Sequence, residues 1–271
     1  MRDLVLAKTF PDSTIIFATQ ALDGNINHKI QEADYTIEIL HSNAKEALLE
    51  LIEKHAIDLL IIDNYAIDYE YEKFIKDKTD IKIFVLDDTY EKHHCDILLN
   101  HNISADAARY KDLVPPECEV RCGSDYTLLR DEFIVQKQKP KASSLHVKNV
   151  LIAMGGADHS NQNINILKVL EGFNNIHAHV VTTTANQHLN ELKNYIKNKT
   201  DVTLHVNSSQ IAKLMHEADF AIATPSVTIN EILYMELPFV AIKTADNQKE
   251  IYEYLHQHDY LVLKKFDADT L

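Results

Sequence analysis

Two adjacent glycines, Gly155 and Gly156, lie between an apolar run at 149–154 and an amphipathic stretch that begins near Asn161. Adjacent glycines at a strand-to-helix junction let backbone N–H groups approach an anion closely, and the helix N-terminus adds about half a positive charge. We interpret this segment, through Asp158, as a cradle for a diphosphate; the alternative is a plain tight turn. The segment is neither the dinucleotide fingerprint nor a P-loop, because it lacks the third glycine and the Gly-Lys-Ser/Thr sequence of those motifs.

A second group of chemically useful residues lies at 223–242, where a strand is expected to turn into a helix. Pro225 ends the strand, and Thr224 and Ser226 supply hydroxyl groups at the turn, with Ser226 a candidate N-cap. Glu231 follows on the helix, where a carboxylate can accept hydrogen bonds from the two hydroxyls of a ribose, as acidic residues do in other α/β nucleotide sites. The alternative is a solvated glutamate on the helix face.

Polar side chains follow two further apolar runs. An expected helix begins with Asp246, Asn247 and Gln248. The two amide side chains can hydrogen-bond the hydroxyls of a sugar. The alternative is that the segment is a helix cap formed by Asp246. Tyr65 follows the apolar run at 59–63, at the carboxyl end of an expected strand, where open α/β sheets bind ligands. Its hydroxyl could donate to a substrate oxygen, and the alternative is a core tyrosine.

The sequence HHCD at 93–96 has the residue types of a metal site but not the arrangement. Neighbouring histidines on a short segment do not present their rings to one ion without a distant third ligand, and no HExxH or paired CxxC motif accompanies them. We therefore expect no metal and no cofactor. Cys95, Cys118 and Cys122 cannot all pair, which points to a reducing compartment.

Length and composition bound the class of protein. The chain has 271 residues, about 1.8 times the roughly 150 typical of one domain, so two domains are expected. The net charge of −14 and the absence of a Lys/Arg cluster argue against nucleic acid as a partner. No apolar stretch approaches about 18 residues, and the N-terminus lacks the layout of a secretion signal, so we expect a cytoplasmic protein with no membrane insertion.

Apolar runs rich in Ile, Val and Leu alternate with amphipathic stretches, the pattern of parallel strands covered by helices on both faces. We predict an α/β protein of two doubly wound, Rossmann-like domains, 1–140 and 141–271, that face each other across a cleft and are joined by a polar linker at 134–148. Strands are predicted at 14–19, 35–40, 59–63, 81–86, 97–100, 119–122, 149–154, 178–183, 202–206, 219–223 and 238–243. Helices are predicted at 44–55, 161–171, 186–198, 208–217, 226–236 and 247–257.

The start of the first domain departs from the pattern of a doubly wound fold. Met1 opens directly into an apolar helical pattern at Leu4 and Val5, with no preceding strand. Because the first strand of such a sheet is usually central, its absence would leave a gap in the middle of the sheet. We expect either a start upstream of Met1 or the loss of the first strand–helix unit.

The chain contains the segments RDLVLAK, LLIIDNY, DDTYEKHHCDILLN, LVPPECEVRCGSDYTLLRDEF, MGGAD, IAKLM, INE and DNQ. Together they resemble the UDP-sugar hydrolases of pseudaminic acid biosynthesis, from residue 2 to about residue 260. The GxxYxLLRxEF-like stretch is specific, with Gly123, Tyr126, Leu129, Arg130 and Phe133. The resemblance implies the glycosyltransferase-B architecture, which is similar to that of the undecaprenyl-linked N-acetylglucosaminyltransferase of peptidoglycan synthesis.

The resemblance also implies a metal-independent reaction. Water would attack the anomeric carbon of UDP-2,4-diacetamido-2,4,6-trideoxy-β-L-altropyranose with inversion, UDP would leave, and the free sugar would go on to a nonulosonic acid used on bacterial flagellin. The loop amides and the helix dipole would stabilise the charge that grows on the diphosphate. Carried over by position, the residues that hold UDP are Gly155, Gly156, Asn161 and Ile164, with Glu231 on the ribose and Tyr65 and Asn247 near the reacting carbon. The expected substrate site is completed by Asp158, Thr224, Ser226 and Gln248.

The general base is where this sequence departs from the family. The resemblance implies a histidine in a Gly-rich loop just before the segment that matches Met1 and Arg2, and that loop is not in this sequence. Losing a general base costs about 100- to 10,000-fold in rate, and His93 and His94 cannot be placed at the reaction centre. Two alternatives therefore stay open: a non-catalytic UDP-sugar-binding protein and a glycosyltransferase of the same fold. We expect a monomer that binds a UDP-sugar.

Overall fold

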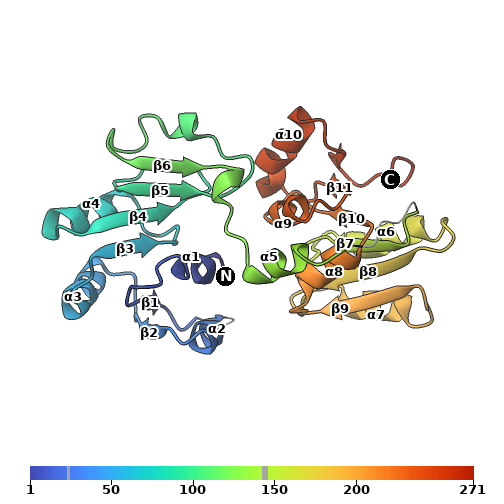
Figure 1. The fold of residues 1–271 in the computed structure, drawn as a ribbon, viewed down its shortest axis with the longest axis horizontal. Coiled ribbons are helices and arrows are strands. Elements are labelled where there is room, and N and C mark those ends of the chain that lie inside the picture. Colours follow the sequence, from blue (N-terminus) through green and yellow to red (C-terminus); the bar gives the residue numbers. More distant parts are fainter. Residues whose placement is uncertain (23–24, 142–145) are drawn as a thin grey trace. The chain divides into compact units, whose positions relative to one another are not determined.

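The structure is a computed structural model that describes residues 1–22, 25–141 and 146–271. Gly24 and the middle of the expected linker lie outside the described residues. The chain divides into two compact units, Met1–Leu128 and Leu129–Leu271 (Figure 1). The division precedes helix α5 (Asp131–Lys137), which packs against α8 (Ile211–Glu217) of the second unit. The expected linker at 134–148 is therefore helical in its first part, because Phe133 and Gln136 are buried and bind the helix to this unit.

The second unit contains one six-stranded parallel sheet in the order β12-β11-β10-β7-β8-β9. Counted along the chain, this is the 3-2-1-4-5-6 order of dinucleotide-binding folds. The Rossmann-like prediction is therefore confirmed for this unit. The strands are β7 (Asn149–Ala153), β8 (His177–Thr182), β9 (Val202–Val206), β10 (Phe220–Ala223), β11 (Phe239–Ile242) and β12 (Val262–Leu263).

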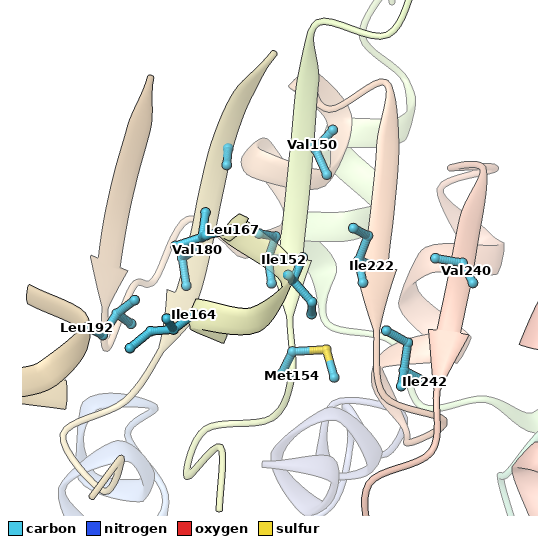
Figure 2. Packing of buried hydrophobic residues seen from close by; sticks show 12 residues of the cluster. Val150, Ile152, Met154, Ile164, Leu167, Val180, Leu192, Ile222, Val240 and Ile242 are labelled. Atoms are coloured by element: carbon cyan, nitrogen blue, oxygen red, sulfur yellow. The ribbon is translucent and has the colours of Figure 1, made fainter. Parts of the chain in front are cut away.

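Apolar side chains from both the strands and the helices build the core of the second unit. In Figure 2, Ile152 of β7 lies between Val180 on one side and Ile222 on the other, and Met154 follows just after the end of the strand. The strands read as nearly continuous apolar runs because helices cover both faces of a parallel sheet. Besides α5 and α8, the helical segments are α6 (Gln162–Leu170), α7 (Leu189–Ile196), α9 (Thr228–Tyr234), η3 (Asp246–Gln248) and α10 (Lys249–Gln257).

The parallel strands of the first unit form two sheets in the described residues, a pair β1-β2 and a four-stranded sheet β3-β4-β5-β6. In the 3-2-1-4-5-6 order one more strand would stand between β1 and β3 and join the two sheets. The described strands of this unit therefore do not form the single continuous sheet seen in the second unit. The strands are β1 (Ile16–Thr19), β2 (Thr36–Ile39), β3 (Leu59–Ile62), β4 (Lys82–Leu86), β5 (Ile97–Asn100) and β6 (Glu119–Cys122).

Alternate residues of β4 face opposite layers of helices in the first unit. Ile83 and Val85 pack with Ile75 of α4 and other side chains of one cluster, whereas Phe84 and Leu86 pack with Leu6 of α1. This alternation follows from the two-residue period of a strand. The helical segments are α1 (Arg2–Ala7), α2 (Asn27–Glu32), α3 (Lys45–His55), α4 (Tyr69–Lys78), η1 (Ala107–Tyr110) and η2 (Ser124–Tyr126).

In the described ranges, no helix has both the length and the apolar character needed to cross a bilayer.

Candidate functional site

The strand register of the second unit gathers three loops at one edge of the sheet. Ala153 of β7 pairs with Ala223 of β10, and Ala223 pairs in turn with Ala241 of β11. Because the strands are parallel and end at the same level, the segments that follow them leave the sheet side by side. Between β7 and β10 the direction of winding reverses, and open α/β sheets bind their ligands at such a point.

The loop after β7 requires both of its glycines, for different reasons. Gly155 has a φ of 82°, a left-handed conformation that only glycine adopts at little cost, and a Cβ there would meet no heavy atom within 4 Å. Gly156 lies against Thr183, whose backbone N–H and hydroxyl donate to the Gly156 carbonyl at 3.1 Å and 3.0 Å. The tight-turn interpretation accounts for Gly156, while the open space beside Gly155 leaves room for a ligand to reach the backbone.

Asp158 caps the helix that follows the diglycine loop. Its side chain is buried, and its two carboxylate oxygens accept hydrogen bonds from the backbone N–H groups of Gln162 and Asn163 at 2.9 Å and 3.1 Å. Burial raises the pKa of the Asp158 carboxyl, although these hydrogen bonds oppose the rise. The carboxylate therefore lies at the N-terminus of α6, where the sequence predicts an anion, and a contact between Asp158 and substrate stays a prediction.

The two expected ligands on the first turn of α6 have different environments. Asn161 adopts a left-handed φ of 52° at the N-cap position, and its amide donates to Glu191 at 2.9 Å. Ile164 is buried and its side chain lies in the core cluster with Leu167 (Figure 2). The helical period places the Ile164 side chain on the face that packs against the sheet, which leaves only the backbone of Ile164 for the expected contact with UDP.

The turn after β10 presents two hydroxyl groups that bond to each other. Thr224 is buried, its hydroxyl donates to the Ser226 oxygen at 3.3 Å, and its backbone N–H donates to the Ala153 carbonyl at 3.2 Å. Ser226 is not the N-cap that the sequence predicted, because α9 begins only at Thr228 and Val227 occupies the cap position without a side-chain hydrogen bond. The Ser226 hydroxyl is instead held within the turn.

Glu231, on α9, is partly buried and has a cationic neighbour, Arg130. Its Oε1 atom accepts a hydrogen bond from Nη2 of Arg130 at 3.1 Å, and 22% of its side chain is exposed. Burial raises the pKa of the Glu231 carboxyl, and Arg130 acts against that rise. The solvated-glutamate alternative is therefore wrong, and the carboxylate is a partly buried group with a fixed cationic neighbour.

The two amide side chains in the segment after β11, Asn247 and Gln248, have different environments. The Gln248 Oε1 atom accepts from the backbone N–H groups of Thr244 and Ala245 at 2.8 Å and 3.2 Å, so this amide fastens the loop to the helix start. Asn247 is exposed, beside the exposed Asp246. Of the two amides that the sequence singled out, Asn247 is the one whose side chain is open to solvent.

Tyr65, in the first unit, belongs to a polar network at the carboxyl ends of β3 and β4. The tyrosine is 73% exposed, which rules out the core alternative, and its hydroxyl donates to Asp88 at 2.7 Å. Arg2 binds Asp63 through two hydrogen bonds of 2.9 Å and 2.5 Å and lies 3.4 Å from Asp88. Burial and the neighbouring Asp63 raise the pKa of Asp3 to about 6.

The comparisons with known proteins bear on this geometry. No family model matches the chain. The chain is 37% identical over 265 residues to the UDP-2,4-diacetamido-2,4,6-trideoxy-β-L-altropyranose hydrolase of Campylobacter jejuni, an alignment that covers 98% of this chain and 93% of that protein. The chain belongs to this hydrolase family. The resemblance predicted from the sequence motifs is thereby confirmed.

Two more distant matches are a protein of spore coat polysaccharide biosynthesis and a solved structure. The chain is 24% identical over 208 residues to the spore coat polysaccharide biosynthesis protein SpsG of Bacillus subtilis, which covers 75% of this chain and 60% of that protein. The crystal structure of Acinetobacter baumannii MurG matches with a TM-score of 0.64 at 11% identity, over 100% of this chain and 83% of MurG. This likeness shows the glycosyltransferase-B fold of two Rossmann-like domains.

In this member of the hydrolase family, three features escaped sequence reasoning. The pairing of Arg130 with Glu231 joins residues that are far apart in the chain, and the Arg2 network joins α1 to two strand ends. His101 follows β5 at the same edge, is buried, and has a pKa lowered to about 4 by burial and by Arg2. The sequence could have indicated some of these residues by their position, because residues that follow the end of a strand lie at the same edge of the sheet. Such residues are Asp63, Asp88 and His101.

The histidines of the HHCD segment also have defined partners. His93 is buried, with its Nδ1 atom 2.7 Å from Glu72 Oε1 and its Nε2 atom 3.8 Å from Asp87 Oδ1. The His94 backbone N–H donates to the second oxygen of Glu72. These contacts make the segment part of a buried ion-pair network beneath the strand ends of the first unit.

Proposed function

We propose that this protein binds a UDP-linked 2,4-diacetamido-2,4,6-trideoxy-altropyranose and hydrolyses it to UDP and the free sugar. The observation that carries the proposal is the convergence of the loops after β7, β10 and β11 where the winding of the sheet reverses. The substrate class is taken from the printed name of the relative that is 37% identical.

The diphosphate is assigned to the loop of Gly155 and Gly156. Support comes from the open space beside Gly155, since a ligand oxygen can approach the backbone there without meeting a side chain. Preorganised N–H groups stabilise charge that develops on a leaving group. Thr224 and Ser226 lie on the neighbouring strand end and are assigned to the same part of the ligand, with Asn161 at its edge.

The ribose is assigned to Glu231, whose partly buried carboxylate can accept hydrogen bonds from both ribose hydroxyls. As the resemblance implies, the sugar is assigned to Asn247 and Tyr65, and each of these side chains is exposed and carries a hydrogen-bonding group. Gln248 supports the loop of Asn247 rather than touching the ligand, since its amide oxygen is bonded to the backbone.

In the proposed reaction, a water oxygen bonds to the anomeric carbon as the bond from that carbon to the diphosphate oxygen breaks. UDP leaves with the bonding electrons, the configuration inverts, and the water proton passes to a general base that we assign to no residue of this sequence. The proposal includes no metal, so activity should survive excess EDTA. The reaction would take place in the cytoplasm. The free sugar would be converted to a nonulosonic acid that is used in bacterial surface glycans, such as those on flagellin.

Two measurements test the proposal. Isothermal titration calorimetry should show one UDP site, and Glu231→Gln should weaken UDP binding by about tenfold or more, the cost of losing hydrogen bonds to a charged acceptor. Chromatography should show UDP released from the altropyranose substrate. Binding without release would favour the non-catalytic UDP-sugar-binding alternative, and no binding would contradict both.

The likeness to MurG supports one other candidate, a sugar transferase of the same fold. A transferase needs an acceptor, so the sugar product distinguishes the two activities. Free sugar that incorporates oxygen from labelled water identifies a hydrolase. Release of UDP only when an acceptor alcohol is present would identify a transferase.

A further inference from the structure

Arg130 lies between two carboxylates at the start of α5. Its Nη1 atom is 2.6 Å from Glu132 Oε1, and its Nη2 atom is 3.1 Å from Glu231 Oε1. The guanidinium carbon also lies 5.0 Å from the centre of the ring of Phe133, which is fully buried. The planar guanidinium is thus fixed by a carboxylate on its own helix and by an aromatic ring, and it presents its remaining edge to Glu231.

A second contact holds the two helices together without Arg130. The Nζ atom of Lys137, at the end of α5, donates to the Tyr234 carbonyl at 2.6 Å and lies 2.9 Å from Glu236. Tyr234 is the last residue of α9, the helix that carries Glu231. The contact between α5 and α9 therefore has two anchors, so a change at Arg130 leaves the helices attached.

We propose that Arg130 is a positioning residue that orients the Glu231 carboxylate toward the ribose of a uridine nucleotide. The inference rests on the proposed function, which assigns the ribose to Glu231. A carboxylate has about four lone-pair positions, so a hydrogen bond from Arg130 to Oε1 leaves acceptor capacity for two ribose hydroxyls.

The positive charge of Arg130 also supports binding of the ribose by Glu231. Burial and the nearby Glu132 raise the pKa of Glu231, whereas the guanidinium lowers it. A protonated Glu231 would carry an O–H donor in place of one acceptor and would bind the two hydroxyls less well. Arg130 therefore favours the ionised form of the carboxylate as well as orienting it.

The test compares UDP with 2′-deoxy-UDP by calorimetry, because the ratio of the two affinities reports the ribose contact alone. The unaltered protein should prefer UDP by about tenfold, the usual effect of one hydrogen bond to a charged group. In Arg130→Gln the preference should fall below about threefold at neutral pH. The pH at which the preference is half lost should be higher in this variant than in the unaltered protein, a change that a merely structural role would not produce.

Arg130→Lys keeps the charge but loses the planar fork that reaches two carboxylates at once. In this variant the pH midpoint should equal that of the unaltered protein, and the preference for UDP over 2′-deoxy-UDP should be about threefold lower. If Arg130→Gln does not fold, Arg130→Lys is the variant that tests the proposal. The matched control is Arg121→Gln, which removes the same charge from a surface pair with Glu119 in the first unit and should change nothing.

The outcomes separate the inference from the function on which it rests. No UDP binding by the unaltered protein overturns the proposed function. A preference for UDP that Glu231→Gln abolishes, but that both Arg130 variants retain in full, overturns the role of Arg130 while the proposed function stands.

Discussion

A Cβ atom built on Gly156 would lie 2.8 Å from Cγ2 of Thr183, closer than side chains pack. The same threonine donates its backbone N–H and its hydroxyl to the Gly156 carbonyl. The loops after β7 and β8 are therefore fastened together at a point where residue 156 can have no side chain. We expect Gly156→Ala to destabilise the second unit by about 1–3 kcal/mol, the cost of overpacking, and to weaken UDP binding as the loop shifts. Urea denaturation and calorimetry measure the two effects.

Two further variants check that the clash with Thr183 is the cause. Gly156→Ala combined with Thr183→Ser removes Cγ2 but keeps the hydroxyl, so most of the lost stability should return. Gly155→Ala meets no atom within 4 Å and should cost only the backbone strain of a positive φ, about 1 kcal/mol. Equal losses in the two single alanine variants would contradict the steric explanation.

Asp158 should behave as a helix cap and not as a ligand. Asp158→Ala is expected to lower the free energy of unfolding by about 1 kcal/mol, because two backbone N–H groups lose their acceptor, while Asp158→Asn should lose less. The affinity for UDP should stay within about twofold in both variants, since no carboxylate contact to the ligand is lost. A loss of tenfold or more in Asp158→Asn would give the residue a direct binding role.

His93 should make stability depend on pH in the alkaline range. Burial alone would lower its pKa, but Asp87 and Glu72 outweigh burial and raise the pKa from 6.5 to about 9. The raised pKa means that the stabilisation is complete below about pH 6.5 and is lost as the pH rises through about 9. The shift corresponds to at most about 3 kcal/mol.

The measurement compares the unaltered protein with His93→Gln by urea denaturation at about pH 6 and about pH 10. The difference in free energy of unfolding between the two proteins should be largest at the lower pH and should narrow at the higher one. A difference that is the same at both values would show that His93 stabilises the fold by packing and not by charge.

Tyr65→Phe should separate binding chemistry from stability. The tyrosine is exposed and loses only its bond to Asp88, so the free energy of unfolding should change by less than about 0.5 kcal/mol. If the hydroxyl contacts the sugar as proposed, kcat/KM for UDP release should fall by about tenfold. Tyr260→Phe, a change at another exposed ring, is the matched control. Equal kcat/KM in all three proteins would remove Tyr65 from the site.

The strands could be predicted from the sequence because parallel strands covered on both faces are runs of mainly apolar residues. The run at 97–100 has the bounds of β5, and the run at 202–206 has those of β9. Helix α5 was missed because its sequence is short and largely polar, and what makes it helical is the burial of Phe133 against the second unit. Where the local sequence pattern is weak, tertiary packing determines whether a segment forms a helix.

The candidate site was predictable where it depends on strand ends and not where it depends on side-chain partners. Gly155, Thr224 and Asn247 are candidates because each follows an apolar run. The capping role of Asp158 and the core position of Ile164 depend on where α6 begins and which face it buries, and a shift of one or two residues changes both. Arg130 and Glu231 are joined by folding alone, so the local pattern around either residue does not indicate the other.

The strand order of the second unit also affects how that unit folds. The segments β7-β8-β9 and β10-β11-β12 each pair strands that are neighbours in the chain, whereas the pairing of β7 with β10 joins the two halves across the whole of the intervening sequence. Closing the longer loop costs more chain entropy, so this pairing is expected to form after the local ones. We therefore expect the loop after β7 to meet the loops after β10 and β11 in the last step of sheet assembly, and a nucleotide bound to all of them to slow the separation of the two halves.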